Sequence, residues 1–158
     1  MHRRIATPSS IAKGANRADP RPSTLTPHPL RTWQWALLVV LLVLPVTALT
    51  HLAAYFGPMQ ILGGALVLSA LTYCVSANDK RKAQLGQWRT PESTLHFLEL
   101  AGGWPGSYLA QRRFRHKVTK LSYQTTFWLI VATHEAIAYD FLQDWRYWNQ
   151  LQTFTRSL

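Results

Sequence analysis

The chain has 158 residues, and 17 Lys or Arg against 7 Asp or Glu give it a formal net charge of +10. Apolar residues make up 47% and charged residues only 15%, below the roughly 25% usual for a soluble domain, which excludes a chain that is disordered throughout. A single cysteine, Cys74, excludes an intramolecular disulfide and a cysteine-based zinc site.

The first 32 residues form a basic arm with six Lys or Arg and one acidic residue. Five prolines exclude a continuous helix because each lacks an amide donor: Pro8, Pro20, Pro22, Pro27 and Pro29. We therefore predict a disordered basic arm over residues 1–32. We interpret it as a solvated tail that helps to fix orientation, with binding of anionic lipid or RNA as the alternative.

Residues 33–56 carry the strongest physical signal. From Ala36 to Leu49 there is no charged residue, and with its flanks the segment reaches the roughly 20 residues needed to cross a bilayer. Aromatic residues typical of membrane interfaces stand at both ends: Trp33, Trp35, Tyr55 and Phe56. We predict a membrane helix rather than a cleaved signal peptide, because the apolar run is long and has no small-x-small site after it.

A second apolar segment, residues 61–77, comes after the Gly57-Pro58 turn and is at the short end of the spanning range. Its small residues allow another helix to approach closely: Gly63, Gly64, Ala65, Ser69 and Ala70. We predict that residues 33–56 and 61–77 form a helical hairpin in the membrane.

A basic block with a semi-apolar middle comes next. Thr90 and Pro91 are typical of a helix start, and the segment from Gly102 to Gly106 interrupts the helix that begins there. A basic amphipathic helix then resumes. We predict a helix-turn-helix over about 91–118 that is too polar to span and therefore lies at the interface or re-enters.

Residues 121–142 are the third candidate span. Phe127 to Ala132 is fully apolar, but His134, Glu135 and Asp140 interrupt the second half of the segment. We predict a spanning helix, with a helix lying flat as the alternative, and an aromatic and polar tail over 143–158. The predicted fold class is an all-α membrane protein. Its membrane domain, residues 33–142, holds about three transmembrane helices plus an amphipathic interfacial or re-entrant helix-turn-helix.

The distribution of cations predicts the orientation, because short loops rich in Lys and Arg stay in the cytoplasm. The arm has six cations and the central block nine, whereas the turn after the first helix has none. The tail has two, Arg146 and Arg156. We predict a multi-pass protein of the bacterial inner (plasma) membrane with a cytoplasmic amino terminus, and an external carboxyl terminus if the third helix spans.

Glu92, His96 and Glu99 are the first candidates for chemistry. Their spacings of four and three place them on one helical face, and two carboxylates with an imidazole are able to bind a transition metal. A di-metal site also needs matching ligands from other helices. A polar face that meets lipid headgroups is therefore the favoured interpretation, and we expect neither a metal site nor a cofactor.

His134 and Glu135 are the second candidates, because an ionisable residue inside a membrane helix is a functional hypothesis by default. Both lie past the apolar centre, so the alternative is a neutral His bonded to a neighbour and a Glu that reaches the interface. His51, at the end of the first helix, is a candidate neighbour of both.

A basic cluster is the third candidate: Arg112, Arg113, Arg115, His116, Lys117 and Lys120. Each such cation contributes about 1 kcal/mol near an anionic leaflet, so attraction to acidic lipid and topological anchoring are the favoured interpretation. Nucleic acid is the alternative through phosphate contacts. Against it, the cluster lacks the interleaved aromatic residues of single-strand readers.

The motifs of the central region resemble one family. They are Tyr73, Asp79-Lys80 and Ala83, then Gly86, Trp88-Arg89, Pro91-Glu92 and Leu95, then Gly102-Gly103-Trp104-Pro105-Gly106, then Arg115-His116-Lys117 and Lys120. Over about residues 73–130 this pattern is similar to the bacterial domain-of-unknown-function family 1294. The resemblance implies a small membrane protein with no established activity. Some members also carry a cold-shock, nucleic-acid-binding domain, for which the arm of this chain is too short.

We predict a non-catalytic membrane component that binds anionic lipid or a membrane-protein partner through a basic cytoplasmic face. The alternatives are a small membrane enzyme or transport accessory that uses Asp79, Glu92 and His116, and nucleic-acid binding by family association only. We expect one polar cluster at the cytoplasmic interface, formed by Asp79, Lys80, Glu92, Arg115, His116 and Lys117. Within it, the carboxylates of Asp79 and Glu92 should face Arg115 and Lys117. The candidate functional motif comprises Asp79, Lys80, Arg89, Glu92, Gly102, Gly103, Gly106, Arg115, His116, Lys117 and Lys120.

Overall fold

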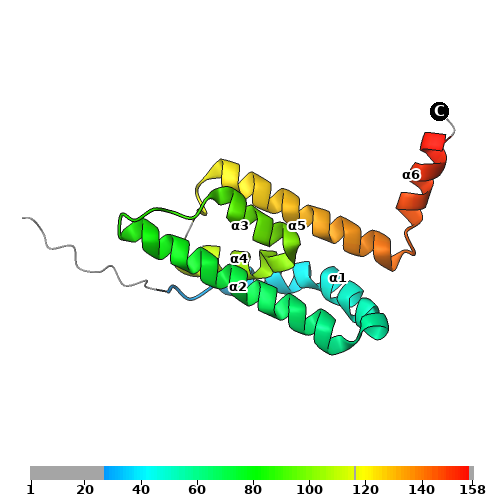
Figure 1. Cartoon of the computed structure of the whole chain (residues 1–158), viewed down its shortest axis with the longest axis horizontal. Coiled ribbons are helices and arrows are strands. Elements are labelled where there is room, and N and C mark those ends of the chain that lie inside the picture. The colour runs from blue at the N-terminus through cyan, green and yellow to red at the C-terminus, as the bar shows by residue number, and fades with distance from the viewer. Residues whose placement is uncertain (1–26, 116, 157–158) are drawn as a thin grey trace, which may run out of the picture.

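The computed structural model describes residues 27–115 and 117–156, and within these ranges it contains helices and no strands. The elements are α1 (Thr32–Phe56), α2 (Pro58–Gln84), α3 (Glu92–Leu98), the π-helical turn η1 (Glu99–Gly103), α4 (Trp104–Phe114), α5 (Leu121–Leu142) and α6 (Arg146–Arg156) (Figure 1). The all-α prediction is confirmed for the described residues. Most of the predicted basic arm, residues 1–26, lies outside them.

Two helices, α1 and α2, are long and apolar enough to cross a membrane. From Thr32 to Asn78 they contain no Lys, Arg, Asp or Glu. Their apolar side chains point outward: Val40 on α1 is 66% exposed and Leu66 on α2 is 72% exposed. A helix that is apolar all round is normally buried in a protein or in lipid. Because the protein covers so little of this surface, the two helices indicate a membrane protein.

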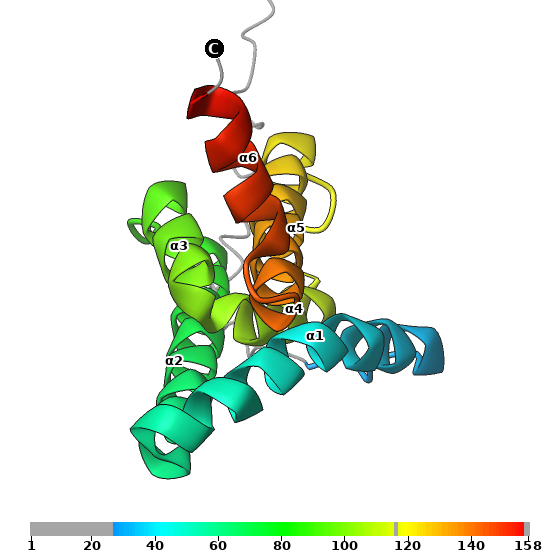
Figure 2. The same cartoon turned by 90° about the vertical axis from the view of Figure 1, so that its right-hand side faces the viewer.

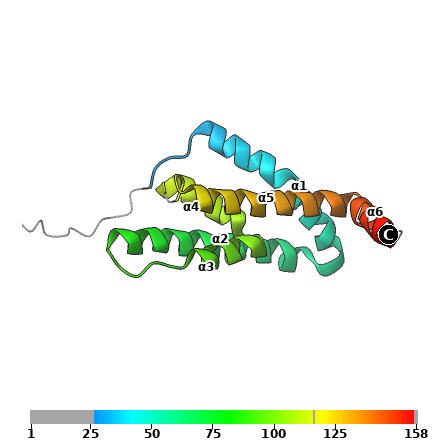
Figure 3. The ribbon, with the colours of Figure 1, turned by 90° about the horizontal axis from the view of Figure 1, so that it is seen from above.

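Helices α2 and α5 run lengthwise through the molecule, and α1 runs obliquely to them (Figures 2 and 3). The start of α1, the end of α2 and the start of α5 lie at one end, and the α1–α2 turn and the end of α5 lie at the other (Figures 1 and 3). Helix α5 therefore runs antiparallel to α2, and α1, on which α5 packs, crosses α5 obliquely in the same general direction (Figures 2 and 3).

The segments α3, η1 and α4 form a hairpin that packs along α2. Gly102 has a φ of 112°, a conformation that side chains rarely tolerate, and it lets the chain turn at the tip of the hairpin. A Cβ atom at Gly103 would overlap Thr72 Oγ1, and one at Gly106 would overlap the Ser69 carbonyl oxygen. Glycine at these two positions is what allows the hairpin backbone to lie directly on α2.

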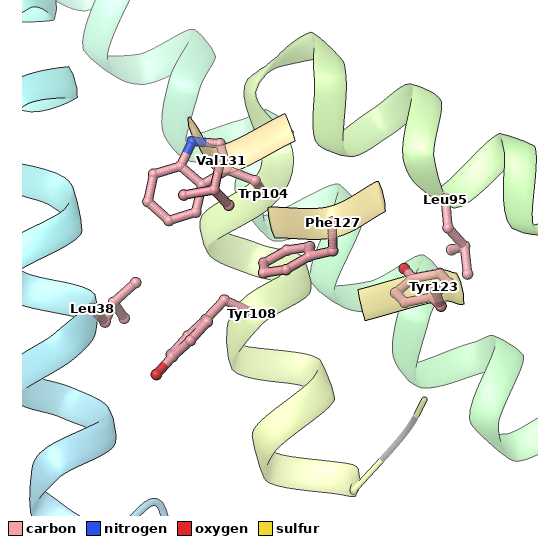
Figure 4. Close-up of a cluster of buried hydrophobic side chains, with 7 residues drawn as sticks. All are labelled: Leu38, Leu95, Trp104, Tyr108, Tyr123, Phe127 and Val131. Atoms are coloured by element: carbon pink, nitrogen blue, oxygen red, sulfur yellow. The ribbon is translucent and has the colours of Figure 1, made fainter. Parts of the chain in front are cut away.

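The core lies where α4 is enclosed by α1, α2 and α5, as the end-on view shows (Figure 2). The Tyr108 hydroxyl of α4 donates to the Gln34 carbonyl oxygen of α1 at 3.0 Å, and the Tyr108 and Trp128 rings meet edge to face. The buried apolar cluster takes side chains from α1, α3, α4 and α5: Leu38, Leu95, Trp104, Tyr108, Tyr123, Phe127 and Val131 (Figure 4).

The close contact of Gly106 with α2 predicts that any side chain at position 106 destabilises the protein. We expect Gly106→Ala to lower the free energy of unfolding by about 1–3 kcal/mol, the usual cost of overpacking, because α4 must move away from α2. Gly64→Ala, on α2 itself, is the matched control, since a Cβ atom at that position meets nothing within 4 Å. Unfolding in mixed micelles titrated with sodium dodecyl sulfate measures both variants. Equal stabilities for the two would contradict the close contact.

Candidate functional site

Charged side chains from three segments meet at the open end of the hairpin. Lys117 Nζ lies 3.6 Å from Asp79 Oδ2 and 3.4 Å from Glu92 Oε1. Lys120 Nζ lies 2.8 Å from Glu92 Oε2. The Thr90 backbone N–H donates to Asp79 Oδ1 at 2.7 Å. We call Asp79, Glu92, Lys117 and Lys120 the ion cluster.

The side chains at the centre of the ion cluster are the least exposed to solvent. The side chain of Asp79 is fully buried and that of Lys117 is 8% exposed, whereas Glu92 and Lys120 are partly open to solvent. The hydrogen bond from Lys120 lowers the pKa of Glu92 below its usual value, and the charge of Lys117 acts in the same direction. Removing one partner of a buried ion pair leaves an uncompensated charge. The ion cluster therefore fastens the end of α2 to the start of α3 and to the segment before α5.

The structure brings together part of the cluster expected from the sequence. Asp79, Glu92 and Lys117 meet, but no ion pair or side-chain hydrogen bond among the described residues involves Lys80 or Arg115. Arg115 ends α4 in the left-handed conformation, with a φ of 46°, and its side chain is exposed. Lys120 instead completes the pairing with Glu92, and His116 lies outside the described residues.

A second group of hydrogen-bonded polar side chains lies nearer the tip of the hairpin. At its centre is Glu99, which is fully buried. Its Oε1 accepts hydrogen bonds of 2.5 Å from both the Ser107 hydroxyl and the Tyr123 hydroxyl. Its Oε2 lies 2.7 Å from His96 Nδ1. Gln111 Nε2 donates in turn to Ser107 Oγ at 3.2 Å. We call Glu99, His96, Ser107, Tyr123 and Gln111 the Glu99 network.

The Glu99 network joins α3, η1, α4 and α5 at one carboxylate. A buried charge is tolerated only when hydrogen bonds or ion pairs compensate for lost water, and Glu99 has three such partners. The network also borders the ion cluster, because Lys117 Nζ sits 4.7 Å from the centre of the Tyr123 ring. The ion cluster and the Glu99 network thus form one continuous polar region that extends from the open end of the hairpin into the protein.

The weak metal candidates do not converge on one point. His96 and Glu99 are hydrogen-bonded to each other. Glu92 lies nearly two helical turns before Glu99 and is paired with Lys117 and Lys120 instead. In residues 27–115 and 117–156, no three His, Cys, Asp or Glu side chains gather in a way that would hold a metal ion.

The intramembrane candidates on α5 are placed separately. His134 Nδ1 lies 2.9 Å from the Ile130 carbonyl oxygen one turn earlier. Glu135 Oε1 is buried and has no hydrogen-bond partner within the described chain. His51 on α1 is exposed, and no hydrogen bond among the described residues joins it to His134 or Glu135.

The remaining motif residues are at the tip of the hairpin and in the loop before it. Gly102, Gly103 and Gly106 form the tip on α2. Arg89 is exposed and borders an open hollow, which Gly86 to Glu92 line together with Lys117.

Sequence reasoning did not single out Ser107, Gln111 or Tyr123. Glu99 and Ser107 stand on opposite sides of the Gly102 turn, so helical periodicity does not relate them. Tyr123 is 24 residues away from Glu99. The one available signal is the spacing of four between Ser107 and Gln111, which puts two polar side chains on one face of a helix.

Comparison with known families supports the motif analysis. Residues 69–123 match the family described as protein of unknown function (DUF1294), and this match confirms the resemblance over that part of the chain. The matched region includes every residue of the ion cluster and of the Glu99 network. No curated protein and no solved structure matches the chain.

The Glu99 network predicts a graded response to substitution. Glu99→Ala leaves the two buried hydroxyls of Ser107 and Tyr123 and the partly buried His96 ring without their shared partner. We therefore expect it to lower the free energy of unfolding by about 3–5 kcal/mol. Glu99→Gln keeps an acceptor oxygen for Ser107 or Tyr123, and we expect a loss of about half that size. Titration with sodium dodecyl sulfate compares the two variants. Equal losses, or none, would contradict the role assigned to this carboxylate.

Proposed function

We propose that this protein is a multi-pass membrane component, without catalytic activity of its own, whose basic cytoplasmic end binds anionic lipid headgroups. The proposal requires α1, α2 and α5 to span, and the hairpin to enter the membrane from the basic end. The geometry supports each of these requirements separately.

Helix α5 has the length and the neighbours of a third span. Its 22 residues extend about 33 Å at 1.5 Å per residue, close to the thickness of the hydrocarbon core. It runs beside α1 and exposes apolar side chains such as Leu129 and Ile137. The bond from His134 to the Ile130 carbonyl satisfies one polar side chain within the helix itself. These features favour spanning over lying flat.

The depth of the hairpin tip supports re-entry. Gly103 and Gly106 contact Thr72 and Ser69, which lie in the middle of the apolar stretch 61–77 of α2. If α2 spans, the tip therefore reaches about the middle of the bilayer. Non-helical backbone at that depth is tolerated where protein buries it. Gly102, which has the non-helical backbone, is half-buried, and the adjoining Gly103 is buried.

The observation that carries lipid binding is the gathering of cations at one end of the molecule. The ends of α2 and α4 and the loops beside them expose basic side chains, while the two acids at this end, Asp79 and Glu92, are already paired with lysines. Besides Lys120, which pairs with Glu92, the exposed cations of the described residues at this end are Arg31, Arg81, Arg89, Arg113 and Arg115.

The hollow beside Arg89 suits a phosphate-bearing headgroup. Arg89 and Lys117 supply positive charge at its wall, and Trp88, which is 90% exposed, adds an aromatic ring of the kind that settles at membrane interfaces. The pairing of Asp79 and Glu92 with lysines favours a locking role for both carboxylates over the acid–base role that an enzyme would need.

The orientation is testable by cysteine labelling. In a Cys74→Ser background, Gln60→Cys and Asn149→Cys should react with an impermeant maleimide in intact spheroplasts, whereas Gln87→Cys should react only after permeabilisation. The reason is that residues 80–120 hold nine Lys or Arg and the α1–α2 turn has none. Labelling at residue 87 in intact spheroplasts would invert the topology. Protection at residue 149 alone would show that α5 does not span.

Lipid binding is testable with purified protein in a neutral detergent. Added dioctanoyl phosphatidylglycerol should raise the Tm more than dioctanoyl phosphatidylcholine does, because a ligand of the folded state stabilises it. Arg89→Gln with Arg115→Gln removes two cations worth about 1 kcal/mol each near an anionic surface, so the apparent affinity should fall roughly 30-fold.

The double variant Arg89→Lys with Arg115→Lys is the matched control, because it keeps both charges. Its affinity should stay within a few fold of the natural protein. Equal Tm shifts with the two lipids, or an unchanged affinity in the glutamine variant, would refute binding of anionic headgroups at this end and would favour a protein or nucleic-acid partner.

A further inference from the structure

Helix α6 (Arg146–Arg156) lies where the sequence predicts an aromatic and polar tail, and among the described elements it packs mainly against the end of α5. It exposes three large apolar side chains: Trp148 at 55%, Leu151 at 59% and Phe154 at 62%. At 100° per residue these lie within 120° of one another. The opposite side carries polar residues: Arg146, Asn149, Gln150, Thr153 and Arg156.

The charge of α6 is entirely positive. It has two arginines, one at each end of its polar side, and no acidic residue. A helix with a narrow apolar face, a cationic polar face and a Trp on the apolar side is typical of segments that lie in the plane of a membrane surface.

The connection to α5 fixes the direction of α6. Asp144 and Trp145 adopt left-handed conformations, with φ of 53° and 58°, which turn the chain sharply. The backbone N–H of Trp148 donates to Asp140 Oδ2 at 3.2 Å, and the Trp145 ring packs edge to face on Phe141. Figures 1 and 3 show that α6 consequently runs steeply across the long direction of α5.

From this geometry we propose that α6 lies in the membrane surface opposite the basic end, with Trp148, Leu151 and Phe154 among the acyl chains and its two arginines at the lipid phosphates. The inference rests on the proposed spanning of α5. If α5 crosses the bilayer, α6 begins at the interface and runs along it. A protein occupant is a poorer fit, because three side chains bury far less than the roughly 800 Å² per partner of a stable interface.

Spin-label accessibility in the full-length protein tests this placement. Labels are attached to Leu151→Cys on the apolar face and Thr153→Cys on the polar face, each in the Cys74→Ser background, after reconstitution in vesicles of phosphatidylcholine and phosphatidylglycerol. We expect the label at 151 to be several-fold more accessible to oxygen, and several-fold less accessible to a water-soluble nickel chelate, than the label at 153.

Two outcomes would overturn the inference. Equal access of the nickel chelate to both labels would place α6 in water, and exclusion of both reagents from the label at 151 would indicate a protein contact. A label at Val67→Cys, on the exposed apolar surface of α2, tests the membrane assignment separately. Oxygen access there with failure at 151 removes only the α6 inference, whereas chelate access at 67 refutes both proposals.

Discussion

The contact of backbone against backbone between the hairpin and α2 determines where the other elements lie. Because Gly103 and Gly106 have no side chains, the first turn of α4 rests directly on Thr72 and Ser69. This fixes the tip. It also sets how far α3 extends toward Asp79 and where Tyr108 meets α1. The ion cluster and the Glu99 network are two further fastenings of the same hairpin, at its open end and near its tip.

The sequence predicts the long helices well because their signals are local. An apolar run without charge, a Gly-Pro turn and a glycine break each act over a few residues, and the structure has helices or turns at these places. Helix α6 is harder to predict because Trp148, Leu151 and Phe154 are spread over nearly two turns among polar residues, so the composition is that of a polar tail. Its amphipathic pattern emerges only when residues are placed on a helical wheel.

The candidate site was predicted less completely, since it depends on geometry that no spacing reveals. Arg115 and Lys117 are two residues apart, and the left-handed conformation at the end of α4 decides which one turns inward. Glu99 was considered only with residues of its own helix, whereas Ser107 and Tyr123 reach it across a chain reversal and from α5. Lys117, shared by the ion cluster and the Tyr123 ring, makes the two groups one unit.

The hairpin occupies only the basic half of the molecule, beside three helices that continue to the other end (Figures 1 and 3). If the three long helices span as proposed, the protein is wider in one leaflet than in the other. It would then displace unequal numbers of lipids from the two leaflets. In the proposed position at the membrane surface on the narrow side, α6 would add area there and reduce this asymmetry.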